Sequence, residues 1–135
     1  MGAWATGPFD NDAAADWVGD LEAAIPNTFV STFRPVTAIE LDLYLEEPEA
    51  SEAIAAAEVV AAMRGFPGQA VRSRPEVLAW AEQHLEWAST DLVNEAVSAV
   101  ERVRAASELR DLWAESEDFQ AWAAGLDDLL SRLRN

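Results

Sequence analysis

The fold class of this chain is decided by the segment ASEAIAAAEVVAAMR, residues 50–64. Seven of its fifteen residues are alanine. Alanine has the highest helix propensity, and its small side chain lets the backbones of neighbouring elements approach closely. Gly65 follows directly and is a natural end cap for a helix. The segment therefore predicts a helix over residues 50–64 that packs tightly against other elements.

Helical patterns also precede this segment. Trp17 and Leu21 are one turn apart in a helix expected over about residues 12–24, and Pro26 is expected to end it. One of the three polar residues 10–12 should cap its first turn.

Three further helical stretches follow a connection at residues 66–75, which is rich in proline and glycine. The first should begin at Ser73, because Glu76 three residues later completes a capping box. The second should be capped by Thr90 and bend near residues 106–107. The third has the cleanest apolar stripe, formed by Phe119, Trp122, Leu126, Leu129, Leu130 and Leu133.

The segment 35–46 fits two patterns. Residues 39–45 alternate between apolar and polar side chains, which is typical of a strand. Ile39 and Leu43 also lie at helical spacing, and Pro35 suits the first turn of a helix. We expect a helix, because no other segment resembles a strand and a lone strand leaves its backbone groups unpaired.

These patterns predict an all-α fold: a compact, irregular bundle of about six helices that forms a single domain over residues 1–135. The bundle should begin with an ordered, non-helical N-terminal segment. Residues 2–9 are expected to pack on the helices, because Trp4 and Phe9 could each bury roughly 150–250 Å².

The charge of the chain restricts its partners. The formal net charge is −16, and residues 1–62 carry twelve acidic residues against one basic residue, Arg34. Such a chain is repelled by nucleic acid and by anionic lipid, so neither is an expected partner. A cationic protein is the expected partner, although a high charge can also serve solubility alone.

Other absences bear on location and chemistry. There is no cysteine, no apolar run of membrane-spanning length and no signal-peptide pattern, so a cytoplasmic protein is expected. The chain has one histidine, no G-x-S-x-G elbow and no H-E-x-x-H motif. We therefore expect a non-enzymatic protein and predict no cofactor and no metal.

Glu58 and His84 are nevertheless candidate catalytic residues. Each has apolar helical neighbours, so each should be paired in the core or lie at a cleft. On facing helices they could share a proton or help to bind a metal or small ligand, although one of each is too few for a full metal site. The structural alternative pairs Glu58 with an arginine such as Arg64 and packs His84 with its hydrogen bonds satisfied.

The leading hypothesis is an acidic protein-interaction module, and one specific version neutralises a basic toxin or nuclease. An enzyme or ligand-binding protein with a site near Glu58 and His84 is the alternative. The candidate contact residues are six acidic residues in the N-terminal half: Glu40, Asp42, Glu46, Glu47, Glu49 and Glu52. Trp4 is a further candidate in the alternative case, in which its ring is exposed instead of packed on the bundle.

Two blocks of the chain resemble the bacterial family known as domain of unknown function 4259. The first is Gly2-Ala3-Trp4, then Thr6-Gly7-Pro8-Phe9-Asp10-Asn11-Asp12, followed by Asp16-Trp17. The second is Ala55-Ala56-Ala57-Glu58-Val59-Val60-Ala61-Ala62 with Gly65, and a weaker likeness covers Ser107-Glu108-Leu109 and Trp113. Ala5 departs from the glycine that relatives commonly carry. The resemblance implies a bacterial, cytoplasmic protein and transfers no functional residue.

Overall fold

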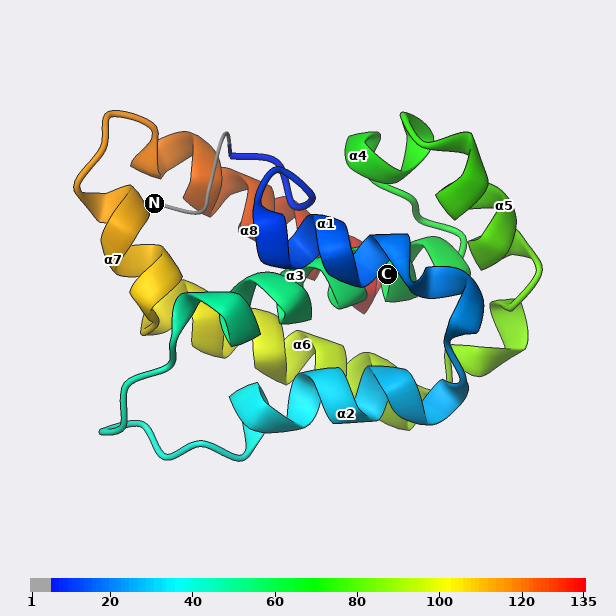
Figure 1. Ribbon diagram of the computed structural model, residues 1–135, viewed down its shortest axis with the longest axis horizontal. Coiled ribbons are helices and arrows are strands. Elements are labelled where there is room, and N and C mark those ends of the chain that lie inside the picture. The colour runs from blue at the N-terminus through cyan, green and yellow to red at the C-terminus, as the bar shows by residue number, and fades with distance from the viewer. Residues whose placement is uncertain (1–5) are drawn as a thin grey trace.

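The computed structural model describes residues 6–135, and an all-α fold is confirmed for this part of the chain. It contains eight α-helices and two short 3-10 turns, with no β-strand (Figure 1). In order, the elements are α1 Asp12–Gly19, a 3-10 turn Leu21–Ala23, α2 Pro26–Thr37, α3 Glu47–Met63, α4 Gln69–Arg72, α5 Pro75–Glu82, a 3-10 turn Leu85–Trp87, α6 Thr90–Ala105, α7 Glu108–Ala114 and α8 Phe119–Arg134.

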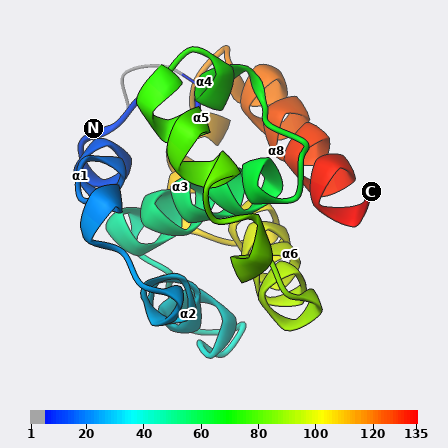
Figure 2. The ribbon, with the colours of Figure 1, turned by 90° about the vertical axis from the view of Figure 1, so that its right-hand side faces the viewer.

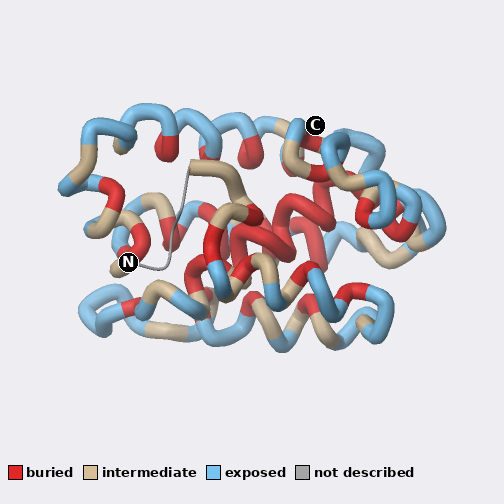
Figure 3. The backbone as a smooth tube through the Cα atoms, turned by 45° about the horizontal axis from the view of Figure 1, so that its top comes forward, coloured by how far each residue is buried: buried red, intermediate tan, exposed pale blue. Residues whose placement is uncertain are grey.

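Helix α3 lies at the centre of the molecule. The other helices surround it, as the view in Figure 2 shows, and Figure 3 shows the buried residues concentrated along it. Every residue from Ala53 to Met63 is buried. A helix that is apolar on all sides belongs in the interior of a bundle. The alanine-rich segment therefore forms the core helix around which the chain folds.

The ends of α3 follow from its sequence. Its last turn is closed at Gly65, which adopts φ 94°, a conformation that side chains disfavour. The amide of Phe66 donates to Ala61 O and the amide of Gly65 donates to Ala62 O, both at 2.9 Å. These two bonds form a Schellman motif, so the predicted role of Gly65 as an end cap is confirmed.

The N-terminal segment enters the bundle through a turn and a cap. The backbone of Asp10 donates to Gly7 O at 3.1 Å, with Pro8 at the second turn position, which it favours. Phe9 is 2% exposed, and the side chain of Asn11 accepts from Ala14 N at 2.9 Å. Packing of Phe9 and capping by residues 10–12 are thus confirmed, whereas Trp4 lies outside the described residues.

Several helix boundaries differ from the expectation. Helix α1 ends at Gly19 and the 3-10 turn follows, so the expected single helix over residues 12–24 is two pieces. Ser73 does not cap α5, because its hydroxyl donates to Gln69 O in the preceding turn. Ser89 rather than Thr90 caps α6, by accepting from Leu92 N at 3.2 Å.

The expected bend near residues 106–107 is a complete break. Ser107 is buried, and its hydroxyl donates to Val103 O and accepts from Arg110 N, so one side chain ends α6 and caps α7. The described residues form eight helices where about six were expected. The additional ones are α7, which is separate from α6, and α4, which forms within the 66–75 connection.

The largest difference concerns residues 26–46. A helix was expected over residues 35–46, but the helix is α2, over Pro26–Thr37, and residues 38–46 are irregular. Pro26 occupies the first turn of α2, where proline is favoured. The buried face of this helix consists of Phe29, Phe33 and Val36.

Candidate functional site

Residues 38–46, which we call the apolar loop, expose large hydrophobic side chains. Leu41 is 80% exposed, Leu43 54% and Tyr44 61%. The loop connects α2 to α3 and projects from one end of the molecule (Figure 1). Clustered exposed apolar side chains on a folded protein mark contact sites more often than chance surface positions do.

The backbone of the apolar loop is bound by Arg102 of α6, which is only 8% exposed. Its guanidinium donates to Leu43 O at 2.8 Å, to Ile39 O at 3.1 Å and to Glu40 O at 3.2 Å. Its Nε donates to Ala106 O at 3.0 Å, where α6 ends. A buried arginine thus supplies the hydrogen bonds that the loop backbone cannot make within itself.

The end of the apolar loop is attached to α7. Leu45 is 2% exposed, and its carbonyl accepts from Glu108 N at 2.8 Å. The carboxylate of Glu108 in turn accepts from Glu47 N, at 2.7 Å, in the first turn of α3. A carboxylate is favourable at a helix N-terminus, so these contacts fix where the loop stops and α3 starts.

Acidic side chains from three helices gather beside this attachment. Burial raises the pKa of Glu47, and the nearby charges of Glu108, Asp12 and Glu49 raise it further, although the Ser51 hydroxyl opposes the shift. We use the name acidic patch for the set Asp12, Asp16, Glu46, Glu47, Glu49, Glu52 and Glu108.

Neighbouring negative charges also raise the pKa of two more side chains, Glu52 and Tyr44. Burial raises the pKa of Glu52, with contributions from Glu49, Asp16 and Glu47. Partial desolvation raises the pKa of the Tyr44 hydroxyl on the apolar loop, together with the charges of Glu108, Asp111, Glu115 and Glu46. The acidic patch and the apolar loop therefore adjoin one another.

The structure brings together most of the acids that were proposed as contact residues. Glu46, Glu47, Glu49 and Glu52 lie at the start of α3, and Glu40 and Asp42 are exposed on the apolar loop. Within residues 6–135, none of these six forms an ion pair. Glu49 Oε2 is buried and has no hydrogen-bond partner in that range. The negative charge at this surface is left without a cation from the described chain.

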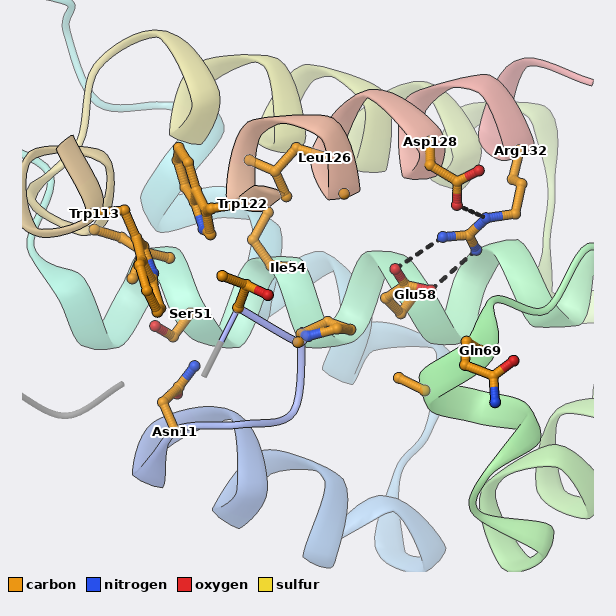
Figure 4. Close-up of a pocket in the computed structure, with 16 residues that line it drawn as sticks. Asn11, Ser51, Ile54, Glu58, Gln69, Trp113, Trp122, Leu126, Asp128 and Arg132 are labelled. Atoms are coloured by element: carbon orange, nitrogen blue, oxygen red, sulfur yellow. Dashed lines mark hydrogen bonds and ion pairs between the residues drawn. The ribbon is translucent and has the colours of Figure 1, made fainter. Parts of the chain in front are cut away.

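A separate pocket of about 170 Å³ lies between α3, α8 and the N-terminal segment. Figure 4 shows Trp113 and Trp122 at one end of it and the pair of Glu58 and Arg132 at the other. Glu58 is 5% exposed, and its two oxygens accept from Arg132 at 3.0 and 2.9 Å. The charge of the candidate Glu58 is therefore already neutralised.

Arg132 is bound on several sides. Burial alone would lower its pKa, but the carboxylates of Glu58 and Asp128 outweigh this and raise the pKa. Its Nε donates to Asp128 at 2.8 Å. The expected pairing of Glu58 with an arginine is confirmed, but the partner is Arg132 and not Arg64, which donates to Asn135 O at the C-terminus. Packing of α8 against α3 selects the partner of Glu58.

His84 does not line this pocket. Its ring stacks on Trp80 with centroids 4.2 Å apart and lies 4.4 Å from the Trp87 ring. Its Nδ1 lies 2.7 Å from Trp80 O, and a carbonyl only accepts, so Nδ1 carries a proton. His84 is thus packed and hydrogen-bonded, and no described contact joins it to Glu58.

No group of three or more histidine or acidic side chains in residues 6–135 is arranged to hold a metal ion. None of the helices in this range combines the length and the apolar character that crossing a bilayer requires.

Sequence patterns missed five residues that contribute to these sites. Leu41, Leu43 and Tyr44 were assigned to a helix, although Leu41 and Leu43 alternate with the acids Glu40 and Asp42. Arg102 carried no signal, because a lone arginine in an amphipathic helix usually faces solvent. Ser51 was hidden in the alanine-rich segment, where a single hydroxyl does not disturb the helical pattern.

The chain belongs to the family described as Domain of unknown function (DUF4259), whose profile matches residues 2–125. The match includes the apolar loop, the acidic patch and Glu58, and it ends before Arg132. No curated protein matches the chain, and no solved structure matches it either.

Proposed function

We propose that this DUF4259 protein is a non-enzymatic interaction module that binds a basic partner protein through the apolar loop and the acidic patch. The observation that carries the proposal is the exposure of Leu41, Leu43 and Tyr44, on a loop whose backbone is bound by Arg102, beside carboxylates without an ion-pair partner among residues 6–135. A fixed loop loses little conformational entropy on binding, which favours affinity. Crowded negative charge favours a cationic partner and speeds its association.

The partner class follows from this chemistry. A matching surface would carry arginine or lysine side chains around an apolar depression that receives the loop. Basic toxins and nucleases have surfaces of this charge, so neutralisation of such a protein is the specific version that we propose. An enzyme that uses Glu58 and His84 together has less support, because Glu58 is paired with Arg132 and the ring of His84 stacks on Trp80 and contacts Trp87.

The test is affinity capture from the source organism with three matched variants. The first variant, L41S/L43S/Y44S, removes the apolar side chains of the loop, and the second, E40Q/D42N/E46Q, removes three exposed charges. The control, E76Q/E82Q/E86Q, removes three exposed charges on and after α5, at the other end of the molecule. All three should fold, because the altered side chains are exposed.

We expect wild type and the control to retain the same partner at about 50 mM salt and to lose most of it at about 500 mM, where charges are screened beyond a few ångströms. The loop and charge variants should retain much less at low salt. Equal recovery by all four proteins, or recovery that does not depend on salt, would contradict the proposal.

A further inference from the structure

The pocket beside α8 has the size of an aromatic ring system and takes no part in the proposed partner contact. Its volume is about 170 Å³. A protein cavity of about 150 Å³ is large enough to bind benzene. Ile54 and Leu126 line it together with the rings of Trp113 and Trp122. Aromatic walls favour an aromatic ligand, through edge-to-face or offset contacts.

The charged end of the pocket does not call for a charged ligand. Arg132 is bound by two oxygens of Glu58, by Asp128 and by Phe66 O, and Glu58 is fully engaged with Arg132. An ionised ligand would have to displace one of these partners and leave it buried without compensation, which is costly. An uncharged ligand fits the pocket best.

Ser51 indicates the polar group of that ligand. It lines the pocket, is 1% exposed, and its Oγ has no hydrogen-bond partner among residues 6–135. In Figure 4 it lies at the tryptophan end, between Trp113 and Asn11. Buried hydroxyls are usually satisfied, so this one is available to a ligand.

Glu47, the neighbour of Ser51, favours a ligand that donates a hydrogen bond to Ser51 over a ligand that accepts one. Glu47 lies four residues earlier on α3, so the two side chains share one face of the helix. Burial raises the pKa of Glu47 and the Ser51 hydroxyl opposes that rise, which agrees with a hydroxyl proton turned toward the carboxylate. Their separation and angle do not make a hydrogen bond of normal geometry. With its proton directed there, the oxygen of Ser51 offers lone pairs to an N–H or O–H group in the pocket.

We propose that this pocket binds a small uncharged aromatic ring that carries one N–H or O–H donor, of about the size of indole or phenol. The donor binds Ser51 Oγ, and the ring lies against Trp113 and Trp122. Two sources can supply this chemistry: a free small molecule or the indole of Trp4. Thr6 lines the pocket, and Trp4 is two residues before it, no more than about 7 Å along the chain.

The experiment titrates indole into the isotope-labelled wild-type protein and into Trp4→Ala, and follows the backbone amide shifts of the pocket residues by NMR. Benzofuran is the matched ligand, because an ether oxygen replaces the N–H group in a ring system of the same shape. Ser51→Ala is the matched protein variant and should fold, since alanine suits the interior of α3.

Indole should bind about tenfold more tightly than benzofuran, the ratio expected for one ordinary hydrogen bond, and the preference should disappear in Ser51→Ala. Binding to wild type identifies a free ligand as the source. Binding to Trp4→Ala alone identifies Trp4 as the resident ring. Absence of indole binding by both proteins, or equal affinity for the two ligands, overturns the proposal.

A second measurement covers the case in which Trp4→Ala does not fold. Trp4→Phe keeps an aromatic ring and removes the donor, so its effect on stability should not add to that of Ser51→Ala if Trp4 occupies the pocket. Additive effects, together with no indole binding by wild type, overturn the proposal for both sources.

Discussion

The apolar loop, residues 38–46, and helix α3, residues 47–63, are consecutive in the chain and both rich in apolar side chains, yet they end in opposite environments. Every residue of α3 from Ala53 onward is buried, whereas Leu41, Leu43 and Tyr44 of the loop are exposed. Each region also depends on one arginine from a distant helix. Arg102 of α6 binds the loop, and Arg132 of α8 binds Glu58 of α3.

The two arginines stabilise their regions in different ways: one neutralises a side-chain charge, and the other binds backbone carbonyls. Within α3 the backbone forms regular helical hydrogen bonds, so what Arg132 neutralises on this helix is the side-chain charge of Glu58, and its one backbone contact is to Phe66 O beyond the helix end. The loop lacks regular structure, and Arg102 binds three of its carbonyls instead. A segment that cannot pair its own backbone needs an outside donor before it can hold a fixed shape.

The largest effect is expected for Arg132→Met, which leaves Glu58 charged and buried without its partner. The free energy of unfolding should fall by about 3–5 kcal/mol, the usual cost of breaking a buried ion pair. Arg134→Met is the control, because Arg134 pairs with Glu101 while both side chains are about half exposed. It should cost at most about 1 kcal/mol. Urea denaturation measures both, and equal losses would show that the Glu58 pair does not stabilise α3.

Arg102→Met should have the next largest effect and act mainly on the loop. It removes four hydrogen bonds from a guanidinium, but the loop carbonyls can turn to water, so we expect a loss of about 2–4 kcal/mol. Hydrogen exchange of the Leu43 amide, which donates to Glu40 O, should accelerate more than exchange within α3.

The matched control for that variant is Arg104→Met. Arg104 lies two residues away on α6 and pairs with Asp127, with side chains 40% and 57% exposed. Its loss should change stability by less than about 1 kcal/mol. If Arg102→Met leaves exchange at Leu43 unchanged, the loop holds its shape without Arg102.

A smaller effect, of opposite sign, is expected for the double variant E47Q/E52Q. The folded state raises the pKa of both carboxyls, so it binds their protons more tightly than the unfolded chain does. In the wild-type protein these two carboxyl groups therefore stabilise the folded state relative to pH 7 when the pH is low and both are protonated. This contribution to the free energy of unfolding is lost as the pH rises through their pKa values in the folded state.

At pH 7 the double variant should therefore melt about 1–3 °C higher than wild type, and the gain should vanish near pH 3, where both carboxyls are protonated in either state. Thermal melts of wild type, the double variant and a charge-matched E82Q/E86Q control measure this. A lower melting temperature at pH 7 would mean that the favourable position of Glu47 at the start of α3 outweighs the crowding of charge.

The smallest effect on stability is expected for Leu41→Ala on the exposed part of the loop. The change should stay within about 0.5 kcal/mol, because the side chain is already in water. Leu45→Ala, at the buried end of the same loop, should cost about 2–4 kcal/mol. Chemical denaturation compares the two, and a large cost at Leu41 would show that this side chain is packed in solution.

Local patterns in the sequence were sufficient where a segment's own residues satisfy its backbone. The stripe from Phe119 to Leu133 predicted α8 closely, and the alanine-rich segment predicted α3 to within a few residues. The Schellman motif at Gly65 was predictable as well, because its two bonds lie within six residues of chain. The stripe of Phe29, Phe33 and Val36 after Pro26 also carried the signal for α2, and it was missed.

The candidate sites were less predictable. The acids of the apolar loop and of α3 could be named from composition, but their meeting with Asp12 and Glu108 depends on how α1 and α7 pack. The pocket could not be foreseen, because Ser51 and Arg132 are eighty-one positions apart and face it from different helices.

By itself, then, the sequence determined the all-α class, the central helix and the excess of negative charge, because helix propensity, apolar period and composition act over a few residues. Only the tertiary structure decided the shape of residues 38–46, the partner of Glu58 and the surroundings of His84. These depend on hydrogen bonds and packing between segments distant in the chain. Arg102 reaches the loop across about sixty residues, and Arg132 reaches Glu58 across 74. Such pairings form only when the helices that carry them have packed together.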